Sequence, residues 1–269
     1  MAYREDRARV NGIGIYYREY GEGDPLLLIM GLGGNADWWD KRFLEMLAER
    51  YRVVTFDNRG AGRSERAPGP YSIPQMADDA AGLMDHLGWE SAHVLGMSMG
   101  GMIAQELALN HSQRVRKLVL VVTTCGGPDQ VPASAEVLQI LYMPKDQVTP
   151  EAIARSTLYL LFPKRFIEEN PELMDEIVAA NLIAPIEPRC FMEQLNAVGR
   201  WGCRSRLKDL DKPTLIITGS EDILIPPENS RILAEAIAGS RLVEYPGVAH
   251  GLISQIPETV AREVLDFLG

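Results

Sequence analysis

The stretch of sequence that decides the fold is Val94-Leu95-Gly96-Met97-Ser98-Met99-Gly100-Gly101-Met102. It has the form G-x-S-x-G, follows a short apolar run and begins a segment with helical spacing. A serine at such a strand-to-helix turn takes strained backbone angles, and side chains two positions before and after it would collide with the turn. The glycines at these positions therefore predict a nucleophilic serine, Ser98, above a sheet. The alternative is a glycine-rich turn whose serine only caps the helix.

Short apolar runs alternate with helix-period stretches on both sides of this turn. Strands are predicted at 26–30, 52–56, 92–95, 117–122, 214–218 and 241–245, and helices at 36–49, 76–87, 99–110, 229–238 and 258–267. This alternation predicts an α/β fold, with parallel strands and helices on both faces of the sheet. The Asn11-Gly12 pair predicts an antiparallel hairpin at one edge.

The section from Cys125 to Leu210 interrupts the alternation. It is rich in helix formers, is punctuated by prolines and contains no convincing strand. Ligand sites of open α/β sheets lie at the carboxyl ends of the strands. We therefore expect residues 1–124 and 211–269 to form the core, and residues 125–210 to form a helical cap, or lid, over those ends.

Charge and cysteine content exclude several classes of protein. The 269 residues carry 27 Lys+Arg and 37 Asp+Glu, and the net charge of -10 disfavours nucleic acid or an anionic membrane as a partner. No apolar run approaches the roughly 20 residues that span a bilayer. The charged residues at the N-terminus, with no apolar stretch behind them, are not typical of a signal peptide. The three cysteines, Cys125, Cys190 and Cys203, include no C-x-x-C pair, which disfavours a disulfide framework or a zinc site. A cytoplasmic location is expected, and the oligomeric state stays open.

A serine hydroxyl needs a base to become a nucleophile. Of the four histidines, His86 falls inside a predicted helix, and His93 and His111 fall at the opposite end of the sheet from Ser98. His250 follows the last predicted strand, so it should lie at the same end as Ser98. His250 is therefore the predicted base.

An acid must orient the imidazole and stabilise its cation. The strand at 214–218 runs into Gly219-Ser220-Glu221-Asp222 at the same end of the sheet. Asp222 is the predicted acid, Glu221 is its close competitor, and a solvated acidic turn is the remaining alternative. The chain order of Ser98, Asp222 and His250 is typical of hydrolases with a serine at this kind of turn.

Acyl transfer also needs two N–H donors for the developing oxyanion. The backbone N–H groups of Met99 and Leu32 are the candidates, the latter in the glycine loop Met30-Gly31-Leu32-Gly33-Gly34-Asn35-Ala36. The same loop fits a G-x-G-x-x-A dinucleotide pattern, with Asp57 about 20 residues on as the acid. That reading is weaker because a hairpin precedes the loop and because it leaves the serine, acid and histidine unexplained.

These motifs, together with residues 57–64 and 247–250, resemble the α/β-hydrolase fold superfamily across essentially the whole chain. Within this superfamily, the chain looks like the small esterase, enol-lactonase and cofactor-free perhydrolase group. The resemblance implies an eight-stranded, mostly parallel sheet with a helical cap inserted after strand six. One residue departs from the pattern: family members usually carry His or Asn where this chain has Met30, so a side chain that would brace the oxyanion loop is missing.

The expected function is that of a serine esterase or lactonase. An acyl-enzyme on Ser98 would cleave ester or lactone bonds of small to medium apolar substrates, without a metal or organic cofactor. Four side chains are expected to bind substrate: Trp38, Phe162, Trp201 and Leu224. A substrate carboxylate could pair with an arginine from the section (Arg165, Arg189, Arg200 or Arg204), although solvated positions are the simpler interpretation. The alternatives are a carbon–carbon bond hydrolase or perhydrolase with the same three residues, and a non-catalytic receptor.

Overall fold

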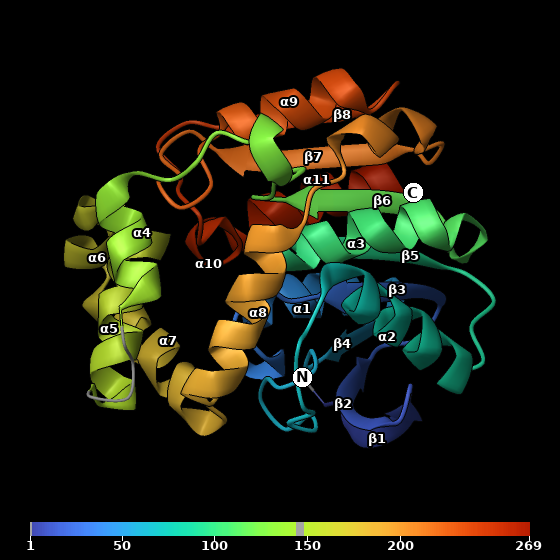
Figure 1. The fold of residues 1–269 in the computed structure, drawn as a ribbon, viewed down its shortest axis with the longest axis horizontal. Coiled ribbons are helices and arrows are strands. Elements are labelled where there is room, and N and C mark those ends of the chain that lie inside the picture. The colour runs from blue at the N-terminus through green and yellow to red at the C-terminus, as the bar shows by residue number, and fades with distance from the viewer. Residues whose placement is uncertain (1, 144–147) are drawn as a thin grey trace.

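A computed structural model describes residues 2–143 and 148–269 (Figure 1). The strands are β1 (Arg4–Val10), β2 (Ile13–Tyr20), β3 (Asp24–Ile29), β4 (Tyr51–Phe56), β5 (Ala92–Met97), β6 (Val115–Val121), β7 (Thr214–Gly219) and β8 (Arg241–Tyr245). The helices are α1 (Lys41–Ala48), α2 (Ile73–His86), α3 (Met99–Asn110), α4 (Ala135–Tyr142), α5 (Pro150–Leu161), α6 (Lys164–Glu169), α7 (Pro171–Ile183), α8 (Pro188–Arg200), α9 (Glu228–Ala236), α10 (Leu252–Gln255) and α11 (Pro257–Leu268).

One eight-stranded sheet forms the centre of the molecule, in the order β1-β2-β4-β3-β5-β6-β7-β8. Strands β3 to β8 are parallel, whereas β1 and β2 form an antiparallel hairpin at one edge. The hairpin turns at Asn11 and Gly12, whose φ angles of 47° and 83° are those that the Asn-Gly pair favours. The predicted fold class is confirmed, and the parallel strands place their carboxyl ends on one side of the molecule.

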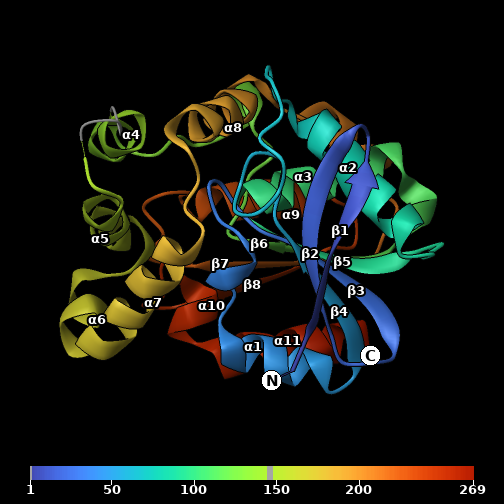
Figure 2. The ribbon, with the colours of Figure 1, turned by 90° about the horizontal axis from the view of Figure 1, so that it is seen from below.

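Helices cover both faces of the sheet (Figures 1 and 2). Helices α1 and α11 lie on one face, and α2, α3 and α9 lie on the other. Because successive strand residues point to opposite faces, Leu27 and Ile29 belong to one buried cluster and Leu26 and Leu28 to the other. Strand β3 is therefore apolar on both sides, as a strand between two helical layers requires.

Helices α4 to α8 come between β6 and β7 and lie beyond the carboxyl ends of the strands (Figure 1). The chain enters and leaves this inserted section at one place. There Gly126 pairs with Gly202 in an isolated antiparallel bridge, and the N–H of Cys203 donates to the carbonyl of Cys125 over 2.9 Å. An inserted helical section after the sixth strand is thus observed, whereas its standing as a separate domain over residues 125–210 stays a prediction. Within the described residues, no helix combines the length and apolarity needed to cross a bilayer.

The helix predicted over residues 36–49 is divided in two. Its first part is a single 3-10 turn, Ala36–Trp38, where the Asn35 side chain accepts the N–H of Asp37. The α-helix begins only at Lys41, because the Asp40 carboxylate accepts two backbone N–H groups of the first turn. The sequence therefore contains two successive caps, and the second one sets the start of α1.

Candidate active site

Ser98 occupies the turn between β5 and α3 with φ 57° and ψ -122°. Few residues with a side chain adopt a positive φ, and they do so where the surrounding structure fixes them. A Cβ on Gly96 would collide with the carbonyl of Gly100, and a Cβ on Gly100 would collide with the carbonyl of Ile29. The two glycines of the motif are therefore needed for packing, as the sequence predicted.

Contacts with the next strand hold the turn at Ser98 in place. The N–H of Ser98 donates to the carbonyl of Val121 over 2.9 Å, and the hydroxyl of Thr123 donates to the carbonyl of Ser98 over 2.7 Å. Between them, Val122 has a positive φ of 43°, which is rare for a β-branched residue. The segment at the end of β6 is thus shaped around the turn.

Asp222 follows β7 and His250 follows β8, and their side chains form a buried pair. The His250 Nδ1 lies 2.7 Å from the Asp222 Oδ2, and the two residues are 2% and 3% exposed. The other oxygen, Oδ1, accepts the backbone N–H groups of Leu224 and Ile225, both over 2.9 Å. Both oxygens therefore have partners, and the pairing fixes the imidazole ring. Glu221, the competing acid, is exposed.

The other histidines have different surroundings. His93 is buried near the amino end of β5, and its Nδ1 has no hydrogen-bond partner. Burial, together with the positive charges of Arg116 and Lys117, lowers the pKa of His93. His111 pairs with Asp78 over 2.8 Å at a partly exposed position. Neither of these two histidines lines the cavity that contains Ser98.

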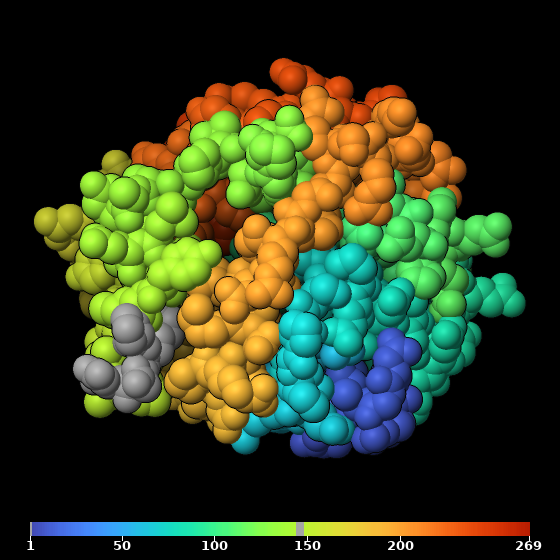
Figure 3. All heavy atoms as spheres, viewed as in Figure 1, coloured from blue at the N-terminus to red at the C-terminus, as the bar shows by residue number. Residues whose placement is uncertain are grey.

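A cavity of about 740 Å³ lies between the carboxyl ends of the strands and the inserted section. Ser98 and His250 both line it, as do Leu32 and Met99, whose N–H groups are the predicted oxyanion donors. Figure 3 shows the molecule hollowed between the green segment around α4 and the orange segment around α8, with part of the red C-terminal region at the base. The fold thus brings together residues from three distant parts of the chain, at Leu32, at Ser98 and Met99, and at His250.

Three of the four predicted substrate-binding residues, Trp38, Phe162 and Leu224, line the same cavity. Trp201 does not line it. The Trp201 indole is buried against α3, where its Nε1 donates to the Glu106 carboxylate over 2.9 Å. Trp201 therefore helps to attach the end of the inserted section to the core.

The glycine loop after β3 forms a tight turn. The N–H of Gly34 donates to the carbonyl of Gly31 over 3.2 Å, and Gly33 has a φ of 72°. A positive φ at the third position is characteristic of a type II turn and favours glycine there. Leu32 occupies the second position. Met99 begins α3, so its N–H has no acceptor within its own helix.

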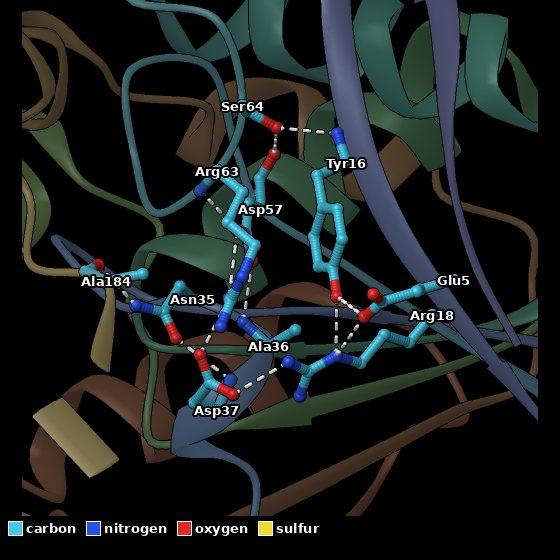
Figure 4. Close-up of polar contacts among 10 residues, drawn as sticks. All are labelled: Glu5, Tyr16, Arg18, Asn35, Ala36, Asp37, Asp57, Arg63, Ser64 and Ala184. Carbon is cyan, nitrogen blue, oxygen red and sulfur yellow. Dashed lines mark hydrogen bonds and ion pairs between the residues drawn. The ribbon is translucent and has the colours of Figure 1, made fainter. Parts of the chain in front are cut away.

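Asp57 fixes the far end of this loop (Figure 4). Its carboxylate is fully buried and accepts the N–H groups of Ala36 and Arg63, each over 2.7 Å. Burial raises the pKa of Asp57 above its ordinary value, because its effect is larger than the opposite effect of these two N–H groups. Because both carboxylate oxygens are occupied inside the protein, Asp57 is not available to bind the ribose of a dinucleotide.

A second group of contacts surrounds the 3-10 turn that ends the loop (Figure 4). Asp37 accepts hydrogen bonds from Arg18 over 2.8 Å and from Arg63 over 2.7 Å. The buried Asn35 amide donates to the carbonyl of Ala184, in the inserted section, over 2.8 Å. The loop is therefore attached to the hairpin, to the segment after β4 and to the inserted section.

Sequence reasoning missed Gln194, on α8. This side chain is fully buried, its Oε1 accepts the N–H of Gly33 over 2.9 Å, and its Nε2 donates to the carbonyl of Arg59 over 3.0 Å. A glutamine in an amphipathic helix ordinarily faces solvent, so no pattern in the sequence distinguished it.

The three cysteines are buried and form no disulfide. Burial raises the pKa of the Cys125 and Cys203 thiols. Both thiols therefore stay protonated near neutral pH and are poor nucleophiles. Within residues 2–143 and 148–269, no three His, Cys, Asp or Glu side chains are grouped so that they could hold a metal ion.

Residues 24–255 match the family described as alpha/beta hydrolase fold. A protein of Azorhizobium caulinodans, named "Putative carbamate hydrolase RutD", is 34% identical over 255 residues, which cover 95% of each chain. The solved enol-lactonase of Burkholderia xenovorans LB400 is 28% identical, with a TM-score of 0.87 over 98% of this chain and 99% of the other. A thermophilic esterase of Thermogutta terrifontis is 28% identical, with a TM-score of 0.84 over 98% of both chains. The chain is therefore a hydrolase of the alpha/beta hydrolase fold family.

Proposed function

We propose that this hydrolase cleaves carboxylic ester or lactone bonds of small to medium, uncharged apolar substrates through an acyl-enzyme on Ser98. The observation that carries the proposal is the buried pair of His250 and Asp222, together with the cavity that His250 and Ser98 both line. A serine in that cavity becomes a nucleophile once a base takes its proton.

The proposed reaction has two steps. His250 takes the hydroxyl proton as the oxygen of Ser98 bonds to the substrate carbonyl carbon, and the N–H groups of Leu32 and Met99 stabilise the oxyanion. His250 then gives the proton to the leaving alcohol as its bond to the carbonyl carbon breaks. Water enters, His250 takes its proton, and the acid leaves as the serine hydroxyl is restored. Asp222 stabilises the imidazolium in both steps.

The charges around the cavity support an uncharged substrate. Among residues 2–143 and 148–269, the cations that line it are Lys41, paired with Glu45, and Arg66, paired with Glu187, and both are exposed. The four arginines considered for a substrate carboxylate, which are Arg165, Arg189, Arg200 and Arg204, do not line the cavity. A free carboxylate inside it would lack a buried partner, and burying an unpaired charge is costly.

A substrate panel with the Ser98→Ala variant tests the proposal. The panel holds p-nitrophenyl esters of two to twelve carbons, a neutral lactone and an aryl carbamate. We expect hydrolysis of esters or lactone by wild type and a loss of at least about 10³-fold in kcat in Ser98→Ala. Ser156→Ala is the matched control, because Ser156 lies on α5 and does not line the cavity. Hydrolysis that persists in Ser98→Ala would contradict the role of Ser98.

Three additions to the panel, which are a vinylogous diketone, peroxide and a fluorophosphonate probe, separate the alternatives. A carbon–carbon bond hydrolase would prefer a vinylogous diketone over every ester, and a perhydrolase would need peroxide for its fastest reaction. A receptor would bind a lactone without turnover, and wild type would not react with a fluorophosphonate that labels activated serines. Preference for the carbamate would keep the same three residues and change only the acyl group.

A further inference from the structure

We propose that Gln194 is a positioning residue that holds the oxyanion loop from the inserted section. The inference rests on the proposed acyl-transfer function, because it assigns the Leu32 N–H to the oxyanion. It is carried by two hydrogen bonds of a fully buried amide. The Gln194 Oε1 accepts the N–H of Gly33, and the Gln194 Nε2 donates to the carbonyl of Arg59.

The geometry of the turn explains why the Gly33 N–H matters. This N–H belongs to the central peptide of the Gly31–Gly34 turn, and type I and type II turns differ mainly in the orientation of that peptide. Because the peptide group is planar, fixing the Gly33 N–H fixes the backbone on the carboxyl side of Leu32. The Gly31–Gly34 hydrogen bond restrains the other side, so the Leu32 N–H has little freedom left.

Two other side chains hold the loop at its ends. Asn58 donates to the carbonyl of Met30 over 2.9 Å, and Asp57 accepts the N–H of Ala36 over 2.7 Å. Both come from the segment after β4, in the core. Gln194 holds the middle of the loop and ties it to the same segment through Arg59. Without Gln194 the loop would keep the side-chain hydrogen bonds at its two ends and lose the one at its turn.

Met30 cannot replace this contact. Its side chain lies against Gly34, where a Cβ would come within 2.7 Å of the Met30 Cγ, and a thioether is at most a weak acceptor. Phe191, one turn before Gln194 on α8, contacts the loop too, because a Cβ on Gly33 would lie 3.1 Å from its ring. Helix α8 therefore supplies apolar packing and a polar anchor to the same turn.

The test compares Gln194→Met with wild type. Methionine has a similar length and helix propensity but neither hydrogen bond. We expect kcat for the best ester to fall by about 10- to 100-fold, which is less than complete loss of an oxyanion donor, while KM stays within about threefold. The inhibition constant of a boronic acid, whose adduct on Ser98 mimics the oxyanion, should rise by the same factor as kcat falls. Amide hydrogens of residues 31–37 should exchange at least about tenfold faster.

Gln105→Met is the matched control. Gln105 is also fully buried and bonds to the carbonyls of Gly101 and Thr124, but it does not touch the oxyanion loop. We expect a comparable loss of thermal stability with a smaller change in kcat and unchanged exchange at residues 31–37. If Gln194→Met fails to fold, Gln194→Asn decides, because it keeps the amide but is too short for both contacts.

The results separate this inference from the proposed function. A folded Gln194 variant with kcat within twofold of wild type, or with unchanged loop exchange, overturns the role of Gln194. Equal effects of the two methionine variants on kcat and on the boronic acid overturn it as well. If wild type neither hydrolyses the panel nor binds the boronic acid, the proposed function fails, and loop exchange alone then decides whether Gln194 holds the turn.

Discussion

The carboxyl ends of the strands and the inserted helical section form opposite walls of one cavity, and they are stabilised in different ways. At the strand ends, buried hydrogen bonds surround Ser98, Asp222 and His250. The inserted section has a small apolar cluster of its own, formed by Ala154, Leu158, Phe162, Met174 and Val178. Several large apolar side chains of that section are exposed, among them Tyr142, Tyr159 and Ile183.

This difference separates two requirements of catalysis. Reacting groups must be held within a fraction of an ångström, which buried and fully bonded side chains achieve. The walls of an apolar substrate cavity need only exclude water and fit the substrate. The side chains of Gln194 and Asn35 form hydrogen bonds between the inserted section and the glycine loop beside the strand ends.

The largest expected effect concerns Asp222. In Asp222→Asn, the amide oxygen still accepts the N–H groups of Leu224 and Ile225, but the amide nitrogen faces the imidazole and stabilises the wrong tautomer. We expect kcat to fall by about 10⁴-fold with a small change in the unfolding midpoint, measured by ester hydrolysis and calorimetry. The exposed Glu221→Gln variant is the control. A larger loss of kcat in Glu221→Gln than in Asp222→Asn would show that Glu221, and not Asp222, is the acid that acts with His250.

Cavity-forming substitutions test whether the two regions differ in stability. Leu28 is fully buried in β3, and Leu28→Ala should lower the free energy of unfolding of the whole chain by about 3–5 kcal/mol. Leu158→Ala should act mainly on the inserted section, so hydrogen exchange should accelerate in α5 and α7 more than in β5. Equal acceleration in all three elements would show that both regions unfold as one unit.

Two glycines sharpen the comparison further. A Cβ at Gly100 would meet backbone, whereas a Cβ at Gly199, on α8, would have the Tyr142 hydroxyl at 3.8 Å as its one neighbour among the residues that the structure describes. Gly100→Ala should cost about 3 kcal/mol and reduce activity, because α3 must move. Gly199→Ala should stabilise the chain by about 0.5–1 kcal/mol, because alanine favours the helix. Chemical denaturation measures the change in free energy of unfolding in both variants. A destabilised Gly199→Ala would contradict the prediction that helix α8 has room for a methyl group at this position.

The smallest effect concerns His93, at the opposite end of the strands from the site. Its lowered pKa means that the unfolded chain binds this proton more readily than the folded chain. Stability should therefore fall as the pH drops below about 6.5, by at most about 1.4 kcal/mol per pH unit for one proton, and be unaffected above it. Wild type should lose free energy of unfolding between pH 6.5 and 5.5, and His93→Phe should lose less, as measured by urea titrations. A larger loss in His93→Phe than in wild type would contradict the predicted effect of His93.

Local patterns were sufficient to predict the sheet and the elements around it. The Asn11-Gly12 pair and the apolar runs express turn chemistry and burial within a few residues. The predicted helix 99–110 coincides with α3, and strand 241–245 coincides with β8. The placement of His250 and Asp222 followed from one geometric rule, that parallel strands share their carboxyl ends.

Contacts between distant segments could not be predicted. Trp201 was expected at the cavity, but its partner Glu106 lies on α3, and only the path of the inserted section brings the two together. Gln194 likewise depends on where α8 crosses the oxyanion loop. Single-residue properties do not show which polar group in a helix finds a buried partner.

The bridge between Gly126 and Gly202 has a consequence for how such proteins diversify. This bridge joins the segment that enters the inserted section to the segment that leaves it. The residues between the two glycines therefore form one closed loop that begins and ends at the same place beside the sheet. The entropy of closing a loop grows only slowly with its length, so segments of other sizes and compositions fit the same junction at little thermodynamic cost. Exchanging residues 127–201 among homologues should therefore change selectivity while Ser98, Asp222 and His250 stay the same, provided that the new segment keeps the contacts of Gln194 and Trp201.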